Sequence, residues 1–189
     1  MIRFDNVSLS FENKKVIDGF TFTFEDKKTY AIMGESGIGK TTLLNIIAGL
    51  LKVDSGSVST DSASVAYAFQ DSRLFPWLTV TDNVMIVSNE PKEAAKKRAL
   101  SILEKLGLSD CADMYPDALS GGMKQRVSIA RALMYDYDVL LLDEPFRALD
   151  EATAKQVAEY VFSESKDKTV IFVTHDKNDA KYADHVITF

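Results

Sequence analysis

The segment "GESGIGKTT", residues 34–42, constrains the fold of this chain more than any other. It matches the pattern G-x-x-x-x-G-K-[ST] in full, and it lies between a strand-like stretch, "TYAIM", and an amphipathic stretch that begins at Lys40. Glycines let successive backbone N–H groups point into one concavity, and a following helix adds its dipole. Because the flanking stretches fit, we expect a polyphosphate site opening a helix rather than a glycine-rich turn with a surface lysine.

Three side chains at the end of this loop carry the expected chemistry. Lys40 would reach the β- and γ-phosphates of a nucleotide, and the hydroxyl of Thr41 would bind Mg²⁺. Thr42 would add a further phosphate contact.

The segment "VLLLDEP", residues 139–145, ends an unbroken apolar run with two acids. Side chains at the carboxyl end of a buried parallel strand face the ligand crevice. We therefore expect Asp143 to hold Mg²⁺, directly or through water, and Glu144 to act as general base toward a water in line with the γ-phosphate. The alternative is a pair of caps for the next helix.

Other polar and aromatic residues end or follow predicted strands. Gln70 follows "SVAYAF" and could touch Mg²⁺ and the attacking water, or be a solvated turn residue. His175 follows "TVIFVT" and could reach the γ-phosphate, or be a structural histidine. Phe11, upstream of the phosphate loop, could stack on a base or belong to the core. Trp77 could be core or an interface anchor, and His185 is expected to be structural.

The apolar patterns predict an α/β fold with two additions. The first thirty residues alternate, with Phe20, Phe22 and Phe24 at period two, which is typical of an antiparallel sheet. The runs "DVLLLDEP" and "TVIFVTHD" favour parallel strands buried on both faces. Helical spacing in "PKEAAKKRALSILEKLGL" favours an α-helical insert over residues 71–135 within a core formed by 1–70 and 136–189.

Bulk composition limits the function classes. The 189 residues carry a net charge of −6, which gives no indication of nucleic-acid binding, and are enough for one domain. The single Cys111 excludes an internal disulfide and fits a reducing compartment. The first residues, "MIRFDNVSLS", lack a signal-peptide core, and no apolar run reaches the ~18 residues of a membrane helix. We expect a soluble, cytoplasmic protein.

The segment "LSGGMKQR", residues 119–126, places a serine and two glycines before a helical pattern. Together with the motifs above, in this order, it resembles the ATPase subunit of an ATP-binding cassette (ABC) transporter, and the resemblance covers nearly the whole chain. "GESGIGKTT" is similar to the Walker A loop, "VLLLDEP" to Walker B, Gln70 to the Q-loop, "ALD" to the D-loop and His175 to the switch histidine. The resemblance implies a RecA-like P-loop NTPase core. "LSGGM" is the most specific motif, because other P-loop ATPases lack it.

The resemblance implies two cofactors, ATP and Mg²⁺, bound in a homodimer. Two such subunits pack head to tail, so Ser120, Gly121 and Gly122 would cap a γ-phosphate held by Lys40 of the other copy, and Asp150 would lie at the seam. Phe11 falls where the family places its adenine-stacking aromatic. The phosphate-loop residues that the resemblance assigns to ATP are Gly34, Glu35, Ser36, Gly37, Ile38, Gly39, Lys40, Thr41 and Thr42.

The resemblance also implies partners. The dimer would sit on the inner face of the membrane, on two transmembrane permease subunits, with a solute-binding protein if the system imports. "DSRLFPWLTVTDNV" and the signature region are most similar to importers of nitrate, sulfonate, taurine and pyrimidine precursors. The solute itself would be bound by other subunits.

Three features depart from the common family pattern. Met123 stands in the signature where glutamine is frequent, and Arg147 stands in "FRALD" where a small residue is common, which puts a charge beside the dimer seam. The sequence ends at "ADHVITF", soon after His175, from which we expect no C-terminal regulation.

Two other classes of function fit less well. Soluble ABC-type ATPases that act on nucleic acid or ribosomes usually carry two cassettes, coiled coils or basic extensions, which this sequence lacks. A small P-loop kinase has no use for "LSGGM", and a GTPase requires an N-K-x-D base reader, which "HDKNDA" does not supply.

Overall fold

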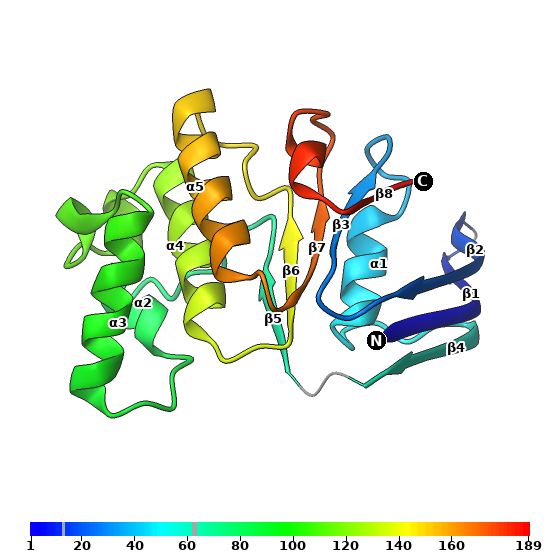
Figure 1. The fold of residues 1–189 in the computed structure, drawn as a ribbon, viewed down its shortest axis with the longest axis horizontal. Coiled ribbons are helices and arrows are strands. Elements are labelled where there is room, and N and C mark those ends of the chain that lie inside the picture. The colour runs from blue at the N-terminus through cyan, green and yellow to red at the C-terminus, as the bar shows by residue number, and fades with distance from the viewer. Residues whose placement is uncertain (13, 62–63) are drawn as a thin grey trace.

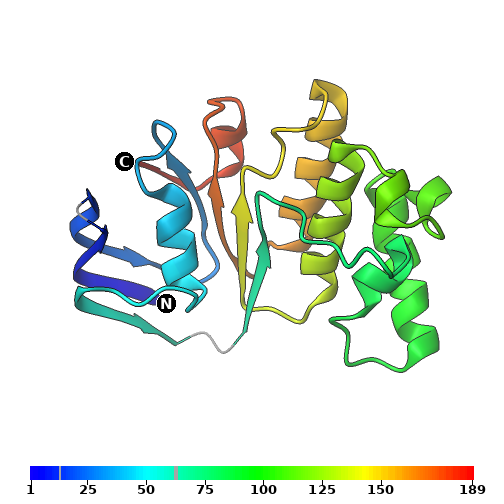
Figure 2. The ribbon, with the colours of Figure 1, turned by 180° about the vertical axis from the view of Figure 1, so that it is seen from behind.

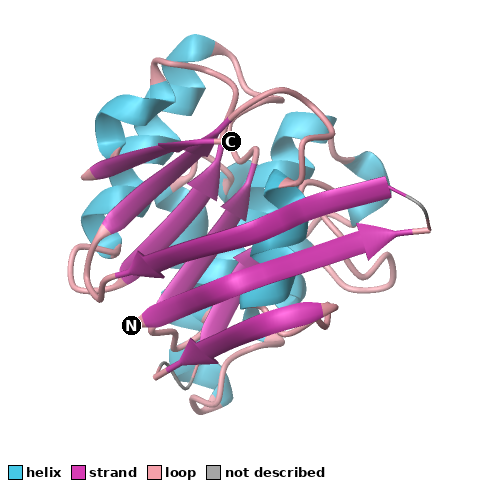
Figure 3. Ribbon diagram, turned by 90° about the vertical axis from the view of Figure 1, so that its right-hand side faces the viewer, coloured by secondary structure: helices cyan, strands magenta, loops and turns pink. Residues whose placement is uncertain are grey.

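An antiparallel sheet forms one end of the molecule. The computed structural model describes residues 1–12, 14–61 and 64–189. Strands β1 (Ile2–Phe11), β2 (Lys14–Phe24) and β4 (Ser55–Thr60) form a three-stranded sheet in the order β2-β1-β4. Figure 3 shows these strands as a separate layer in front of the others. The alternation of the first strands is confirmed, whereas "SGSVST" carries no apolar alternation and becomes a strand through its pairing with β1.

The second sheet is parallel and carries the predicted buried strands. Its order is β5 (Val65–Ala68), β6 (Val139–Asp143), β7 (Thr169–Val173), β3 (Thr29–Met33) and β8 (His185–Thr188). Every residue of β6 and of β7 is buried, as the unbroken apolar runs predict. The sequence pattern did not predict β8, which pairs with β3 at the edge of the sheet.

Both faces of the parallel sheet are covered. Leu141 and Ile171 pack with helix α1 (Lys40–Ile47) and the antiparallel sheet, on the side that Figure 2 shows in front. Leu140 and Phe172 face the other way, into the core that includes α4 (Gly121–Met134) and α5 (Glu151–Glu164). Each such side chain contributes about 1.5–3 kcal/mol on burial. Burial on both faces is why these strands read as continuous apolar runs.

Helices gather beyond the β5 edge, at the left of Figure 1. Helices α2 (Val80–Met85), α3 (Lys92–Lys105) and α4 contact one another, and α4 also contacts β5. The predicted apolar face of α3 is buried, and Gly107, with φ of 65°, follows its end. The short 3₁₀ helices Ser109–Cys111, Pro116–Ala118 and Asp179–Tyr182 complete the elements of the described chain. A subdomain boundary at 71–135 remains a prediction, because one apolar core runs through these helices and the sheet.

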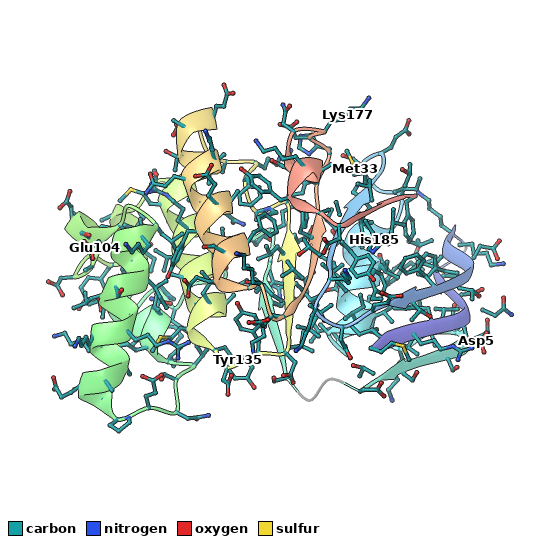
Figure 4. All side chains as sticks on the ribbon, viewed as in Figure 1. Asp5, Met33, Glu104, Tyr135, Lys177 and His185 are labelled. Atoms are coloured by element: carbon teal, nitrogen blue, oxygen red, sulfur yellow. The ribbon has the colours of Figure 1, made fainter. Side chains whose placement is uncertain are left out.

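Several single-residue interpretations are decided by the fold. Trp77 is 68% exposed, so the interpretation as a core residue is wrong. Cys111 is buried, and its thiol donates a hydrogen bond to the carbonyl of Leu108. His185, labelled in Figure 4, lies on the exposed edge strand β8, and its ring stacks on Tyr30 with centroids 5.1 Å apart. Among the described residues, no helix has both the length and the apolar character needed to cross a bilayer.

Candidate active site

The carboxyl ends of three neighbouring strands bring the predicted motifs together. Strand β7 lies between β6 and β3, and the backbone N–H of Glu144 donates to the carbonyl of Val173 at 3.0 Å. The N–H of Thr174 donates in turn to the carbonyl of Ile32 at 3.2 Å. The two acids after β6, the residues after β7 and the phosphate loop after β3 therefore meet at one edge, the upper one in Figure 1.

The phosphate loop is closed around Lys40. This side chain is 6% exposed, and its ammonium donates to the carbonyls of Gly34 at 2.9 Å and Glu35 at 2.8 Å. Gly39, just before α1, has φ of 117°, and a Cβ there would lie 2.9 Å from Cγ1 of Val16. A side chain at this position would be strained and would collide with β2. The loop thus holds a desolvated cation at the start of a helix, which is a site for an anion.

A cleft of about 370 Å³ opens beside this loop. Its volume is in the range of small-molecule sites. Its lining residues are Phe11, Val16, Ser36, Gly37, Gly39, Lys40, Thr41, Thr42, Gln70, Glu144, Arg147 and Val173. Phe11 is 46% exposed, so its interpretation as a core residue is wrong, and it borders the cleft from the antiparallel sheet. The structure therefore brings Phe11, Gln70 and Glu144 to the phosphate loop.

Asp143 is a buried carboxyl group beside the phosphate loop. It is 2% exposed, and its Oδ1 has no hydrogen-bond partner among the described residues. Burial raises the pKa of its carboxyl, while hydrogen bonding to Thr41 and the charge of Lys40 act in the opposite direction. Removing a carboxylate oxygen from water without a partner is costly, so this atom is suited to accept a cation.

The donors around Asp143 fit Mg²⁺. The ion prefers oxygen ligands and usually combines one or two protein groups with phosphate and water. The carboxylate of Asp143 and the hydroxyl of Thr41 are such groups, and the amide of Gln70 borders the same cleft. The described residues contain no group of three or more histidine, cysteine or acidic side chains that could hold a metal. The remaining ligands would therefore come from the nucleotide and from water.

Glu144 presents its carboxylate to two basic side chains. Its φ of 47° lies in the left-handed region, which costs a residue other than glycine roughly 1–2 kcal/mol, and its side chain is 10% exposed. Oε2 accepts a hydrogen bond from Nη1 of Arg147 at 2.8 Å, and Oε1 lies 3.7 Å from Nδ1 of His175. His175 does not line the nucleotide cleft. It lines a neighbouring cavity of about 490 Å³, which Glu144 and Arg147 also border.

The signature residues lie elsewhere in the chain. Ser120 caps α4 by accepting a hydrogen bond from the N–H of Met123 at 3.3 Å. Asp150 caps α5 in the same way, and its hydrogen bonds with Thr153 lower the pKa of its carboxyl. The residues predicted to bind ATP that lie outside the cleft lining are Gly34, Glu35, Ile38, Ser120, Gly121, Gly122 and Asp150, and the predicted metal ligand Asp143 is also absent from it. Of these, Gly34 and Glu35 act through their carbonyls on Lys40.

Sequence reasoning did not place Val16, Arg147 or Val173 at the cleft, although all three border it. The two valines carry no chemical signal, because they are ordinary members of apolar strands. Arg147 did carry one, since a cation three residues after an acid can pair with it across a turn. The sequence placed Arg147 beside the dimer seam and did not connect it with Glu144.

Comparison with known proteins decides the family. Residues 17–147 match the ABC transporter family. The chain belongs to this family. The aliphatic sulfonates import ATP-binding protein of Corynebacterium glutamicum is 41% identical over 184 residues, covering 94% of this chain and 75% of the relative. A Staphylococcus aureus relative named for hemin import is 37% identical over 193 residues, covering 92% of this chain and 87% of its own.

Solved structures confirm the predicted fold class. An ATP-binding cassette solved as a dimer in a post-hydrolysis state, bound to ADP and Pi, superposes with a TM-score of 0.91 at 31% identity. The alignment covers 100% of this chain and 94% of that one. The fold is thus an α/β P-loop NTPase with an antiparallel β-subdomain, and the resemblance to ABC transporter ATPases is confirmed. The chain is an ATP hydrolase of the ABC type.

Proposed function

We propose that this ABC ATPase works as a homodimer that binds two ATP molecules between its subunits and drives import through two permease subunits. The proposed dimer rests on one observation: Ser120 caps α4 and lies outside the cleft that Lys40 lines. Figure 1 places α4 across β6 and β7 from α1. A helix N-terminus opened by two glycines attracts an anion. A second copy, packed head to tail, supplies that anion as the γ-phosphate of its own ATP.

The chemistry within one cleft follows from its residues. Phe11 stacks on the adenine, and Lys40 and the loop N–H groups bind the β- and γ-phosphates. Thr41, Asp143 and Gln70 would hold Mg²⁺, which would neutralise charge on the phosphates. Glu144 takes a proton from the attacking water. His175 turns from the neighbouring cavity toward the γ-phosphate, and Asp150 joins the seam of the closed dimer.

The role in transport rests on the relatives and on one exposed surface. Trp77, which is 68% exposed, stands between Pro76 and Leu78 in the loop before α2. A large apolar side chain in this position suits contact with a permease on the inner face of the membrane. The sulfonate importer relatives favour a small anionic nutrient as solute, bound by a separate protein.

The closing test uses Glu144→Gln, which keeps the size of the side chain but removes the base. With ATP and Mg²⁺ this variant should release no phosphate and should form a stable dimer, while ADP should leave it monomeric. Phosphate release and light scattering coupled to gel filtration measure the two effects. Glu104→Gln, on the exposed face of α3, is the control and should hydrolyse ATP like the wild type. A Glu144→Gln protein that stays monomeric with ATP and Mg²⁺ contradicts the sandwich.

A further inference from the structure

The turn after β6 holds Arg147 against Glu144. The N–H of Arg147 donates to the carbonyl of Glu144 at 3.3 Å, and the guanidinium returns to Oε2 of the same residue at 2.8 Å. Pro145 and Phe146 between them are buried, and the ring of Phe146 packs edge-on against Phe162. The turn is therefore anchored at its centre. Its arginine side chain is 59% exposed and lies outside this packed centre.

The pairing engages one of the two carboxylate oxygens that could take a proton from the attacking water. A general base needs a lone pair directed at the water whose proton it takes. In this structure Oε2 of Glu144 accepts from Arg147, and Oε1 faces Nδ1 of His175 at 3.7 Å. Each carboxylate oxygen thus faces a basic side chain, and the guanidinium lies at the border of the cleft in which the water must stand.

A second cavity beside Arg147 could accept its side chain if the pairing with Glu144 breaks. Arg147 borders both the nucleotide cleft and the neighbouring cavity of about 490 Å³. A triphosphate entering the cleft adds several negative charges, and these weaken the attraction between the guanidinium and Glu144 without a direct phosphate contact. Ion pairs with an exposed partner are weak, so the contact restrains Glu144 without blocking it permanently.

We propose that Arg147 is a positioning residue for hydrolysis: it restrains Glu144 in the isolated chain and releases it when the ATP-bound dimer closes. The proposal rests on the proposed role of Glu144 as general base. The restraint ties the release of Glu144 to closure of the dimer, so that hydrolysis is slowed until the closed dimer has formed. It also explains why a charged residue can stand where a small one is common.

The first test compares Arg147→Ala, Arg147→Lys and the wild type by kcat and KM for ATP. Arg147→Ala should raise kcat roughly two- to five-fold with little change in KM, because an exposed ion pair is worth no more than that. Arg147→Lys should lie between, since lysine keeps the charge but not the planar fork. Lys155→Ala removes an exposed cation from the same neighbouring cavity and should leave both constants unchanged. A lower kcat with a higher KM would make Arg147 a phosphate ligand and overturn the restraint.

The second test separates Glu144 from the dimer seam. A non-hydrolysable ATP analogue is titrated into the wild type, Arg147→Ala, Glu144→Gln and the double variant, and dimerisation is measured by light scattering. Arg147→Ala should lower the half-saturating subunit concentration two- to five-fold when Glu144 is present, and should have no effect when it is glutamine. Equal effects in both backgrounds would place Arg147 at the seam and overturn the proposal. Turnover of ATP by Glu144→Gln, measured in a separate phosphate-release assay, would instead refute the general-base role, which distinguishes the two failures.

Discussion

At the scale of single residues, Asp143 shows how stability and function oppose each other. Its carboxylate is buried with one oxygen unpartnered, which disfavours the charged form and raises the pKa. The folded chain therefore binds a proton at this group more readily than the unfolded chain does. Stability contributed by this group falls as the pH rises from its ordinary pKa, 3.8, through its raised value, and the loss is complete above that value.

Asp143→Asn should consequently stabilise the protein in the absence of nucleotide and Mg²⁺. We expect a gain of about 1 kcal/mol or more in the free energy of unfolding at neutral pH, since an unpaired buried polar group costs about 1–3 kcal/mol. The gain should shrink as the pH is lowered toward 4, and Mg²⁺-dependent hydrolysis should be lost. Urea unfolding at several pH values measures the difference, with the exposed Asp136→Asn as control. A less stable Asp143→Asn at neutral pH would show that the carboxylate is satisfied in the native state.

At the scale of elements, the start of α4 is tied to the segment that follows β6. A Cβ on Gly122 would lie 2.8 Å from the carbonyl oxygen of Ala148 and 3.2 Å from Cδ2 of Leu149, whereas a Cβ on Gly121 would meet nothing within 4 Å. The signature and the segment that leads to Asp150 are therefore packed against each other within one chain. We expect α4 and that segment to move together, because the backbones at Gly122 and Ala148 are in close contact.

The two adjacent glycines give a matched pair of variants. Gly121→Ala should keep or raise the melting temperature, since alanine favours a helix by up to about 1 kcal/mol over glycine. Gly122→Ala should lower stability by about 1–3 kcal/mol through overpacking. Calorimetry of both variants tests this difference. In the dimer, Gly121→Ala should still reduce hydrolysis, because its open face is where the γ-phosphate of the other copy would lie. Full activity in Gly121→Ala would argue against that placement.

At the scale of the whole molecule, one cleft contains Lys40 and Glu144 but not Ser120. This arrangement predicts which inactive variants can complement one another. Lys40→Ala and Ser120→Arg should each be inactive alone. Mixed in equal amounts they should recover about a quarter of wild-type hydrolysis, because random pairing of a symmetric dimer makes half of the dimers mixed, each with one intact site of two.

The control for this experiment follows from the same geometry. Lys40→Ala mixed with Glu144→Gln should recover nothing, because the two residues serve the same cleft of the same chain, and each site lacks one of them. Phosphate release at fixed total protein measures both mixtures. Recovery in the control and none in the first mixture would contradict this model, because it would place Ser120 in the same subunit as Lys40 at each site and Glu144 in the other subunit.

The sequence by itself determined the local chemistry and the buried strands. "GESGIGKTT" and "VLLLDEP" carry dense local signals, because a phosphate loop needs glycines at fixed spacing and a strand covered on both faces needs an unbroken apolar run. The parallel sheet, α3 and the order of the motifs could be predicted from such local patterns. The interpretation of "LSGGMKQR" came from family resemblance; the family is confirmed, and the role of this segment at the site stays a prediction.

Only the tertiary structure decided which residues share the cleft and where strands form without a predictive sequence pattern. Strands β4 and β8 form because β1 and β3 offer them backbone N–H and C=O groups to pair with, and this pairing leaves no signal in the side-chain pattern. The exposure of Phe11 and Trp77, the orphaned oxygen of Asp143 and the pairing of Arg147 with Glu144 depend on distances between elements far apart in the chain or across a turn. Residue spacing reports periodicity along one element, whereas burial and charge pairing are set by how the elements pack.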